Sequence, residues 1–120
     1  MSLKQSRLAK YIGLLKLLQK ANLQQRKFIL ETSDPEFIKL ICECCLNAIQ
    51  GNVPLTPIRE RKLAKYAPVL RKIGTKGTQS KAILWKRKLL VQHGGFLPAL
   101  LAPIISVAGG LLGELIGRNL

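Results

Sequence analysis

The sequence predicts an all-α protein, in which a small helical bundle of four to five short helices is followed by a hydrophobic C-terminal helix. Three observations predict this fold class. Apolar residues recur at the spacing of a helical face, proline twice follows a helix-capping residue, and no stretch alternates apolar and polar residues as a strand would. At 120 residues, the chain has room for one small domain.

The N-terminal third predicts two helices. In the first, one apolar face follows the i, i+3, i+4, i+7 pattern and consists of Leu8, Tyr11, Ile12, Leu15 and Leu18. A second short helix is expected to begin at Asn22 and to run through Phe28 to Leu30.

The third helix is the best defined. Asp34 is a favourable N-cap, Pro35 occupies the first helical position, and Gly51 is placed to end the helix. Its polar residues form a single narrow stripe, made of Glu36, Lys39, Glu43, Asn47 and Gln50. A helix that is apolar on every other side is expected to be packed on most of its surface, so we predict that it is the core helix.

The second half repeats the signal of a cap followed by proline at Thr56-Pro57. The helical face that follows consists of Leu63, Tyr66, Leu70 and Ile73, and Pro68 is expected to kink or divide this helix near Tyr66. A basic loop at residues 74–78 leads to a last cationic helix from Ser80 to about Val91, which Gly94-Gly95 ends.

Charge is distributed unevenly along the chain. Residues 1–30 carry seven bases and no acid, residues 31–58 sum to −3, and residues 59–88 carry eleven bases and one acid, a net +10. Two basic flanks therefore enclose a near-neutral centre. The candidate phosphate-binding residues are the eleven bases of the second flank: Arg59, Arg61, Lys62, Lys65, Arg71, Lys72, Lys76, Lys81, Lys86, Arg87 and Lys88.

Such a concentration of charge predicts a polyanionic partner. Phosphate neutralisation with counterion release needs only many Lys and Arg, and it is indifferent to base sequence. No helix-turn-helix, zinc-finger or RNP signature is present to read bases, and the few aromatic residues argue against a platform for single strands. Nucleic acid is therefore a predicted partner, and anionic lipid, which also attracts Lys and Arg, is the alternative.

The charge pattern ends abruptly at Gly94-Gly95, because residues 96–113 are all uncharged. We therefore predict a basic helical domain at 1–93 and an apolar tail at 94–120. The residues expected to serve membrane interaction or self-association are Phe96, Leu97, Leu100, Leu101, Ile104, Ile105, Gly109, Gly113 and Gly117. Three alternatives stay open: the tail inserts into a membrane through residues 96–117, it packs on the domain, a second copy or a capsid protein, or proteolysis removes it.

No active site, cofactor or metal site is predicted, so we expect a protein that is not an enzyme. Cys42, Cys44 and Cys45 have only the distant His93 as a further soft ligand, which does not fit the paired spacing of zinc sites. Three clustered cysteines cannot form a disulfide framework and indicate reduced thiols in an intracellular protein.

Two resemblances add a context. The segment GGFLPALLAPII at 94–105, preceded by a basic stretch, resembles the C-terminal tail of the adenovirus core protein mu (protein X) precursor. The segments ICECCLN at 41–47, GNVPLT at 51–56 and KLLVQ at 88–92 resemble small basic proteins of Maverick/Polinton elements and adintoviruses.

These resemblances imply a virion core protein that condenses double-stranded DNA, located in the virion and the host nucleus, with a membrane-active or cleavable tail. One residue departs from the adenoviral pattern. The adenoviral protease requires a large aliphatic residue two places before the glycines, and this chain has Gln92 there. The resemblance therefore does not extend to cleavage after Gly95.

Overall fold

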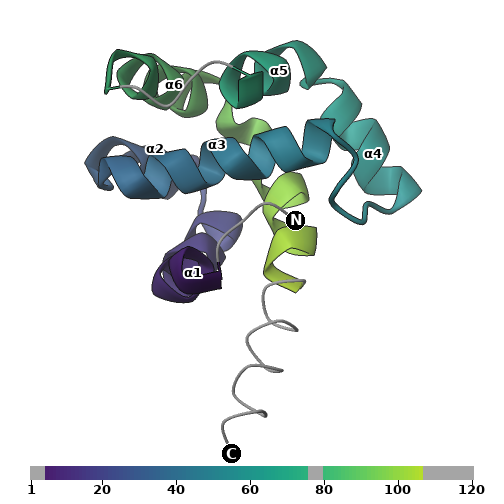
Figure 1. Ribbon diagram of the computed structural model, residues 1–120, viewed down its shortest axis with the longest axis horizontal. Helices are drawn as coiled ribbons and strands as arrows, with labels where there is room; N and C mark the ends of the chain where they lie inside the picture. The colour runs from purple at the N-terminus through teal and green to yellow at the C-terminus, as the bar shows by residue number, and fades with distance from the viewer. Residues whose placement is uncertain (1–4, 76–79, 107–120) are drawn as a thin grey trace, which may run out of the picture.

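The computed structural model describes residues 5–75 and 80–106, and each regular element within these ranges is helical (Figure 1). The elements are α1 (Gln5–Lys20), α2 (Leu23–Thr32), α3 (Pro35–Ile49), α4 (Pro57–Ala64), α5 (Ala67–Thr75), α6 (Ser80–His93) and the 3₁₀ turn η1 (Gly94–Phe96). Residues 97–106 continue as helix after η1. The all-α class is confirmed, with six α-helices in the described part before the apolar segment where four to five were predicted.

The additional helix arises at Pro68. Proline lacks a backbone N–H and its ring clashes with the carbonyl four residues earlier, so an α-helix cannot run through it undisturbed. Accordingly α4 ends at Ala64 and α5 begins at Ala67. The division near Tyr66 that the sequence predicted is confirmed.

Capping residues fix where three helices begin. Asn22, Asp34 and Thr56 each accept, through the side chain, a hydrogen bond from the backbone N–H three residues later. At the far end of α3, Gly51 has a φ of 74°, a left-handed conformation that favours glycine and lets the chain turn away.

α3 is the core helix, as predicted. It lies across the middle of the molecule in Figure 1 and packs chiefly against α5, with α6 and α1 against other parts of its surface. Its buried residues are Phe37, Ile38, Leu40, Ile41, Cys42, Cys44, Cys45 and Asn47. The Asn47 amide is satisfied within the helix, because it donates a hydrogen bond to the Glu43 carbonyl oxygen at 2.8 Å.

The apolar residues after Gly94-Gly95 belong to the same core. Helical residues 97–106 cross α3 on its far side in the view of Figure 1. Five side chains from this part are fully buried together with those of α1 and α3: Phe96, Leu97, Leu100, Leu101 and Ile104. Up to Ile105, the segment therefore packs on the helical domain, which is one of the alternatives that the sequence left open.

Charged pairs join α1 to α3. The Arg7 guanidinium donates a hydrogen bond to the Glu43 carboxylate, and the Lys10 ammonium lies 3.1 Å from the Glu36 carboxylate. The acids of α3 therefore partner two cations of the first basic flank. These pairs orient α1, although ion pairs near the surface add little to the free energy of unfolding.

Tyr11 strengthens the same contact. Its hydroxyl donates to the Asp34 carboxylate at 2.9 Å, while its ring lies 5.4 Å from that of Phe37. The Phe37 backbone N–H, followed by the Tyr11 hydroxyl, holds the pKa of Asp34 below its usual range. The Lys10 ammonium, followed by the same hydroxyl, lowers the pKa of Glu36.

The packing of residues 96–104 predicts a large cost for Leu100→Ala. Leu100 is fully buried, so truncation removes its burial and leaves a cavity, and we expect the free energy of unfolding to fall by about 2–5 kcal/mol. Urea unfolding measures this change. Leu17→Ala, at a leucine that is 63% exposed, is the matched control and should change it by about 0.5 kcal/mol or less. Equal effects of the two substitutions would contradict the packing of this segment.

The lowered pKa of Asp34 predicts loss of stability in acid. An acid whose folded pKa lies below its unfolded value, about 4, stabilises the fold fully above that pH and ceases to do so as the pH falls through the folded pKa. Asp34→Asn keeps a good N-cap but removes the titration. Between pH 5 and pH 3, the denaturant midpoint of the natural chain should therefore fall further than that of the variant. Parallel curves would refute the assignment.

Candidate polyanion-binding surface

α4 and its C-cap residue carry four cations that no acid of the described chain neutralises by an ion pair. Arg61, Lys62 and Lys65 are exposed, and Arg59 is half-buried. Ion pairs join α1 to α3 instead. Arg7 and Lys10 of α1 thus join helices, whereas the cations of α4 make no such ion pair with a described acid.

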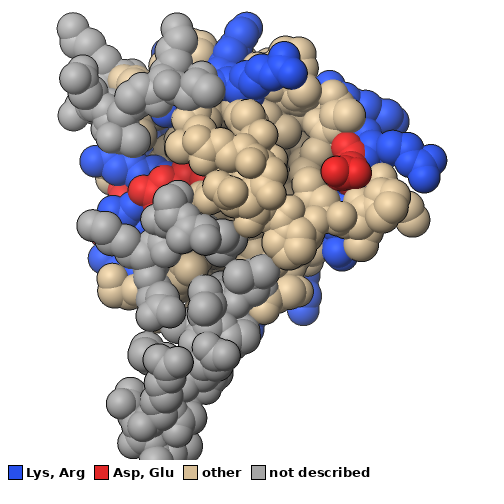
Figure 2. Space-filling view, turned by 45° about the vertical axis from the view of Figure 1, so that its right-hand side comes forward, with Lys and Arg blue, Asp and Glu red and all other residues tan. Residues whose placement is uncertain are grey.

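Figure 1 places α4 at one end of the molecule, beyond the end of α3. Figure 2 turns that end forward and shows Lys and Arg side chains, with acidic side chains beside some of them, at the edges of a face whose centre is uncharged. A charged rim of this kind can approach an extended polyanion without burying the domain's apolar surface.

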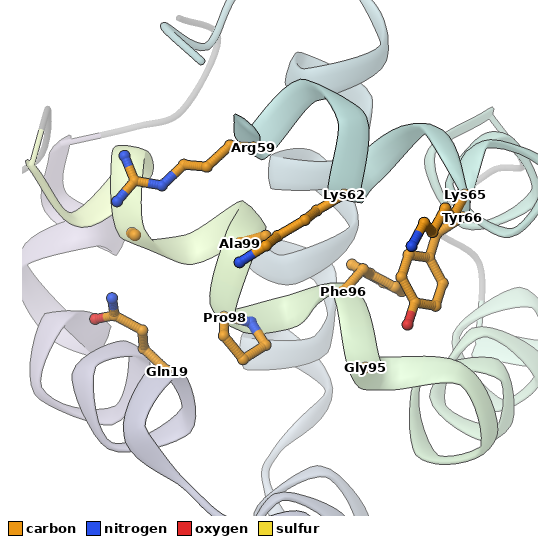
Figure 3. A pocket seen from close by; sticks show the side chains of 10 residues that line it. Gln19, Arg59, Lys62, Lys65, Tyr66, Gly95, Phe96, Pro98 and Ala99 are labelled. Carbon is orange, nitrogen blue, oxygen red and sulfur yellow. The ribbon is translucent and has the colours of Figure 1, made fainter. Parts of the chain in front are cut away.

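A groove of about 400 Å³ runs between α4 and the segment that follows η1 (Figure 3). Arg59, Lys62 and Lys65 line one side of it, and their spacing of three residues places them on one face of α4. Figure 3 shows Arg59 and Lys62 extending from α4 alongside the segment that carries Pro98 and Ala99, whereas Lys65 lies beside Tyr66. The remaining lining residues are Gln19, Tyr66, Gly95, Phe96, Pro98, Ala99 and Ala102.

The charged side chains that line the groove are all positive. Among the described residues that line it, three are cationic and none is acidic. Tyr66 and Gln19 add a hydroxyl and an amide, both able to donate hydrogen bonds to an anion. The opposite side is made by small apolar residues, Pro98, Ala99 and Ala102, whose low polarity strengthens the field of the cations facing them.

Gly95 lines this groove at its contact with Tyr66. A Cβ at this position would lie 2.9 Å from the Tyr66 hydroxyl oxygen, so only glycine lets Tyr66 lie where it does. The Tyr66 ring also packs against Phe96, with 5.6 Å between ring centroids. The glycine pair therefore allows a close contact between the turn and the residue that follows α4.

The remaining predicted phosphate-binding residues are distributed over α5 and α6. Arg71, Lys72 and Lys88 are exposed and lie outside the groove. Lys76 lies outside the described residues, and the structure does not describe the side chain of Lys81. The structure therefore brings together three of the predicted cations in one groove and disperses three others.

The predicted phosphate contact is wrong for Lys86, which is only 1% exposed. It occupies a core position of α6, on the face that also carries Ile83 and Leu90, and it interacts electrostatically with the Cys42 thiol. The spacing Ile83-Lys86-Leu90 is the sequence signal for this inward orientation.

Arg87, also predicted to bind phosphate, instead holds two helices together through hydrogen bonds. Its guanidinium donates hydrogen bonds to the carbonyl oxygens of Leu30 and Ser33, at 2.6 and 2.8 Å. These carbonyls lie at the C-terminal end of α2, where a cation compensates both the unpaired acceptors and the helix dipole. Arg87 therefore joins α6 to α2.

The residues predicted for membrane interaction or self-association fall into two groups. Phe96, Leu97, Leu100, Leu101 and Ile104 are buried in the core, and Ile105 packs against it. Gly109, Gly113 and Gly117 lie outside the described residues. Within the described ranges, one helical stretch, Ala82–Ser106, is long and apolar enough to span a membrane by length and composition, and 44% of its most apolar window is buried.

The cysteines form a buried thiol cluster. Burial raises the pKa of Cys42 to about 11 and raises those of Cys44 and Cys45 further, so the thiols are neutral and unreactive at physiological pH. In the part of the chain that the structure describes, no three His, Cys, Asp or Glu side chains are grouped so as to hold a metal ion.

Sequence reasoning did not identify Gln19, Tyr66 or Gly95 as members of a site. The spacing of Arg59, Lys62 and Lys65 already indicates one face of a helix, and Tyr66 follows directly. Nothing local in the sequence indicates that Gln19 of α1 would line the same groove, because this depends on tertiary packing.

Comparison with protein-family models, curated proteins and solved structures found no match to this chain.

The contact of Arg87 predicts a stability defect for Arg87→Gln. Loss of charge-assisted hydrogen bonds to two carbonyl oxygens should lower the free energy of unfolding by about 1.5–3 kcal/mol. Lys88→Gln, which removes the same charge from the neighbouring exposed residue, is the control and should leave stability nearly unchanged. Denaturant unfolding of both variants measures the difference, and similar midpoints would exclude the structural contact.

Proposed function

We propose that this chain is a non-enzymatic protein that binds and condenses double-stranded DNA without sequence specificity, as a core protein of a virus or virus-like mobile element. The observation that carries the proposal is the set of α4 cations, which have no ion pair with any acid of the described chain. An extended polyanion is the partner that such a surface suits best.

The mechanism is phosphate neutralisation. Each Lys or Arg that approaches a backbone phosphate releases condensed counterions, so affinity falls steeply as salt rises. Such contacts fix the protein on the duplex without reading bases. The formal charge of +14 further accelerates encounter with DNA.

The viral context rests on the resemblances of the basic stretch, the glycine pair and the apolar segment to adenoviral and Polinton core proteins. These support a place in the virion and in the host nucleus. They also support a second partner for the apolar segment, either a capsid protein or a second copy.

A membrane-active protein is the second candidate. The stretch Ala82–Ser106 favours it by length and composition, and the cations of α4 would then bind anionic lipid head groups. Burial of Phe96, Leu100 and Ile104 in the core opposes it, because membrane insertion of this segment would expose that core. DNA binding is therefore the better supported function.

The proposal predicts a steep salt dependence that depends on α4. Replacing Arg59, Arg61, Lys62 and Lys65 together by Gln should make the slope of log affinity against log salt shallower by about 3–4, since each phosphate contact contributes about 0.9. Fluorescence anisotropy with duplexes of unrelated sequence measures the slope, and the sequences should behave alike.

The matched control replaces four cations of α1, α2 and α3 by Gln: Lys16, Lys20, Lys27 and Lys39. It removes the same charge and should change the slope by less than about 1. Absence of salt-dependent binding by the natural chain would overturn the proposed function. Equal effects of both variants would show that α4 is not the binding surface.

A further inference from the structure

We infer that the groove between α4 and residues 95–102, and not the outer face of α4, is where a DNA backbone is held. The inference rests on the proposed function and deepens it, because it names the groove and the part of DNA that occupies it. The ligand chemistry is a run of phosphodiesters, contacted by three cations and two neutral donors.

The cations have a spacing that suits consecutive phosphates. Arg59 and Lys65 are six residues apart, which corresponds to about 9 Å along a helix axis. One strand of duplex DNA carries a phosphate about every 3.4 Å of its axis, so about two or three phosphates fall within this span. With Lys62 between them, three side chains can each meet one phosphate.

The other polar residues of the groove add donors that net charge alone would not predict. Tyr66 and Gln19 line the same groove as the cations and come from different parts of the fold. Tyr hydroxyls and Gln amides are common partners of phosphate oxygens. A surface that merely attracted DNA would not need them.

The apolar side of the groove also favours a DNA backbone as its occupant. Pro98, Ala99 and Ala102 are small and uncharged, so a backbone can approach the cations closely. Arg61 offers an internal comparison, because it is an exposed cation of the same helix that does not line the groove.

The test compares two triple variants of equal charge. The groove variant replaces Arg59, Lys62 and Lys65 by Gln, and the outer variant replaces Arg61, Lys72 and Lys88 by Gln. With duplex DNA, the groove variant should make the salt slope shallower by about 2.7 and the outer variant by less than about 1. At fixed moderate salt, affinity should fall at least about tenfold further in the groove variant.

A second pair of variants tests the groove without removing a cation. Ala99→Glu places a negative charge among the lining residues, whereas Ala64→Glu places the same charge at an exposed position of α4 outside the groove. Both variants are first checked for an unchanged helical signal and unfolding midpoint. DNA affinity should fall at least about fivefold further for Ala99→Glu.

The outcomes separate the two proposals. Equal losses in both pairs of variants would overturn the groove while leaving DNA binding by net charge intact. If the natural chain showed no salt-dependent DNA binding, the proposed function would fail as well. Binding only to phosphatidylserine vesicles, lost in the groove variant, would overturn the DNA backbone as occupant and assign the groove to a lipid phosphate.

Discussion

α3 imposes the constraint on which the rest of the structure depends, because nearly all of its surface is apolar. A helix with one narrow polar stripe cannot face water, and its burial requires neighbours on several sides. α5 and α6 cover part of it, and α1 docks through pairs formed with the stripe's own acids. Glu36 and Glu43, two of the six acids of the chain, are thereby committed to helix packing.

The use of these acids in helix packing affects where positive charge remains without a nearby acid. The chain has only six acids for twenty Lys and Arg, and Asp34, Glu36 and Glu43 are used at the contact between α1 and α3. The excess of positive charge therefore falls on helices far from that contact, of which α4 is the clearest case. α4 itself carries one acid, Glu60, beside its cations, so a net positive charge remains there.

The sequence predicts the core helix, its caps and the division at Pro68 because these follow from local chemistry. It does not predict the inward position of Lys86, since a run of three cations suggests exposure and only the spacing with Ile83 and Leu90 argues otherwise. From sequence alone, the apolar segment at 96–105 could pack on the domain, insert into a membrane or bind a partner. Apolar composition does not specify which of these it contacts. Gln19 reaches the groove only through tertiary packing.

The glycine pair connects core packing with the groove. η1 carries Phe96 into the core, and the absence of a side chain at Gly95 lets Tyr66 lie against the turn. The same turn sets the direction in which Pro98 and Ala99 run alongside α4 (Figure 3). The groove therefore exists only while the apolar segment is packed, so the two parts of the chain that meet at Gly94-Gly95 line one groove together.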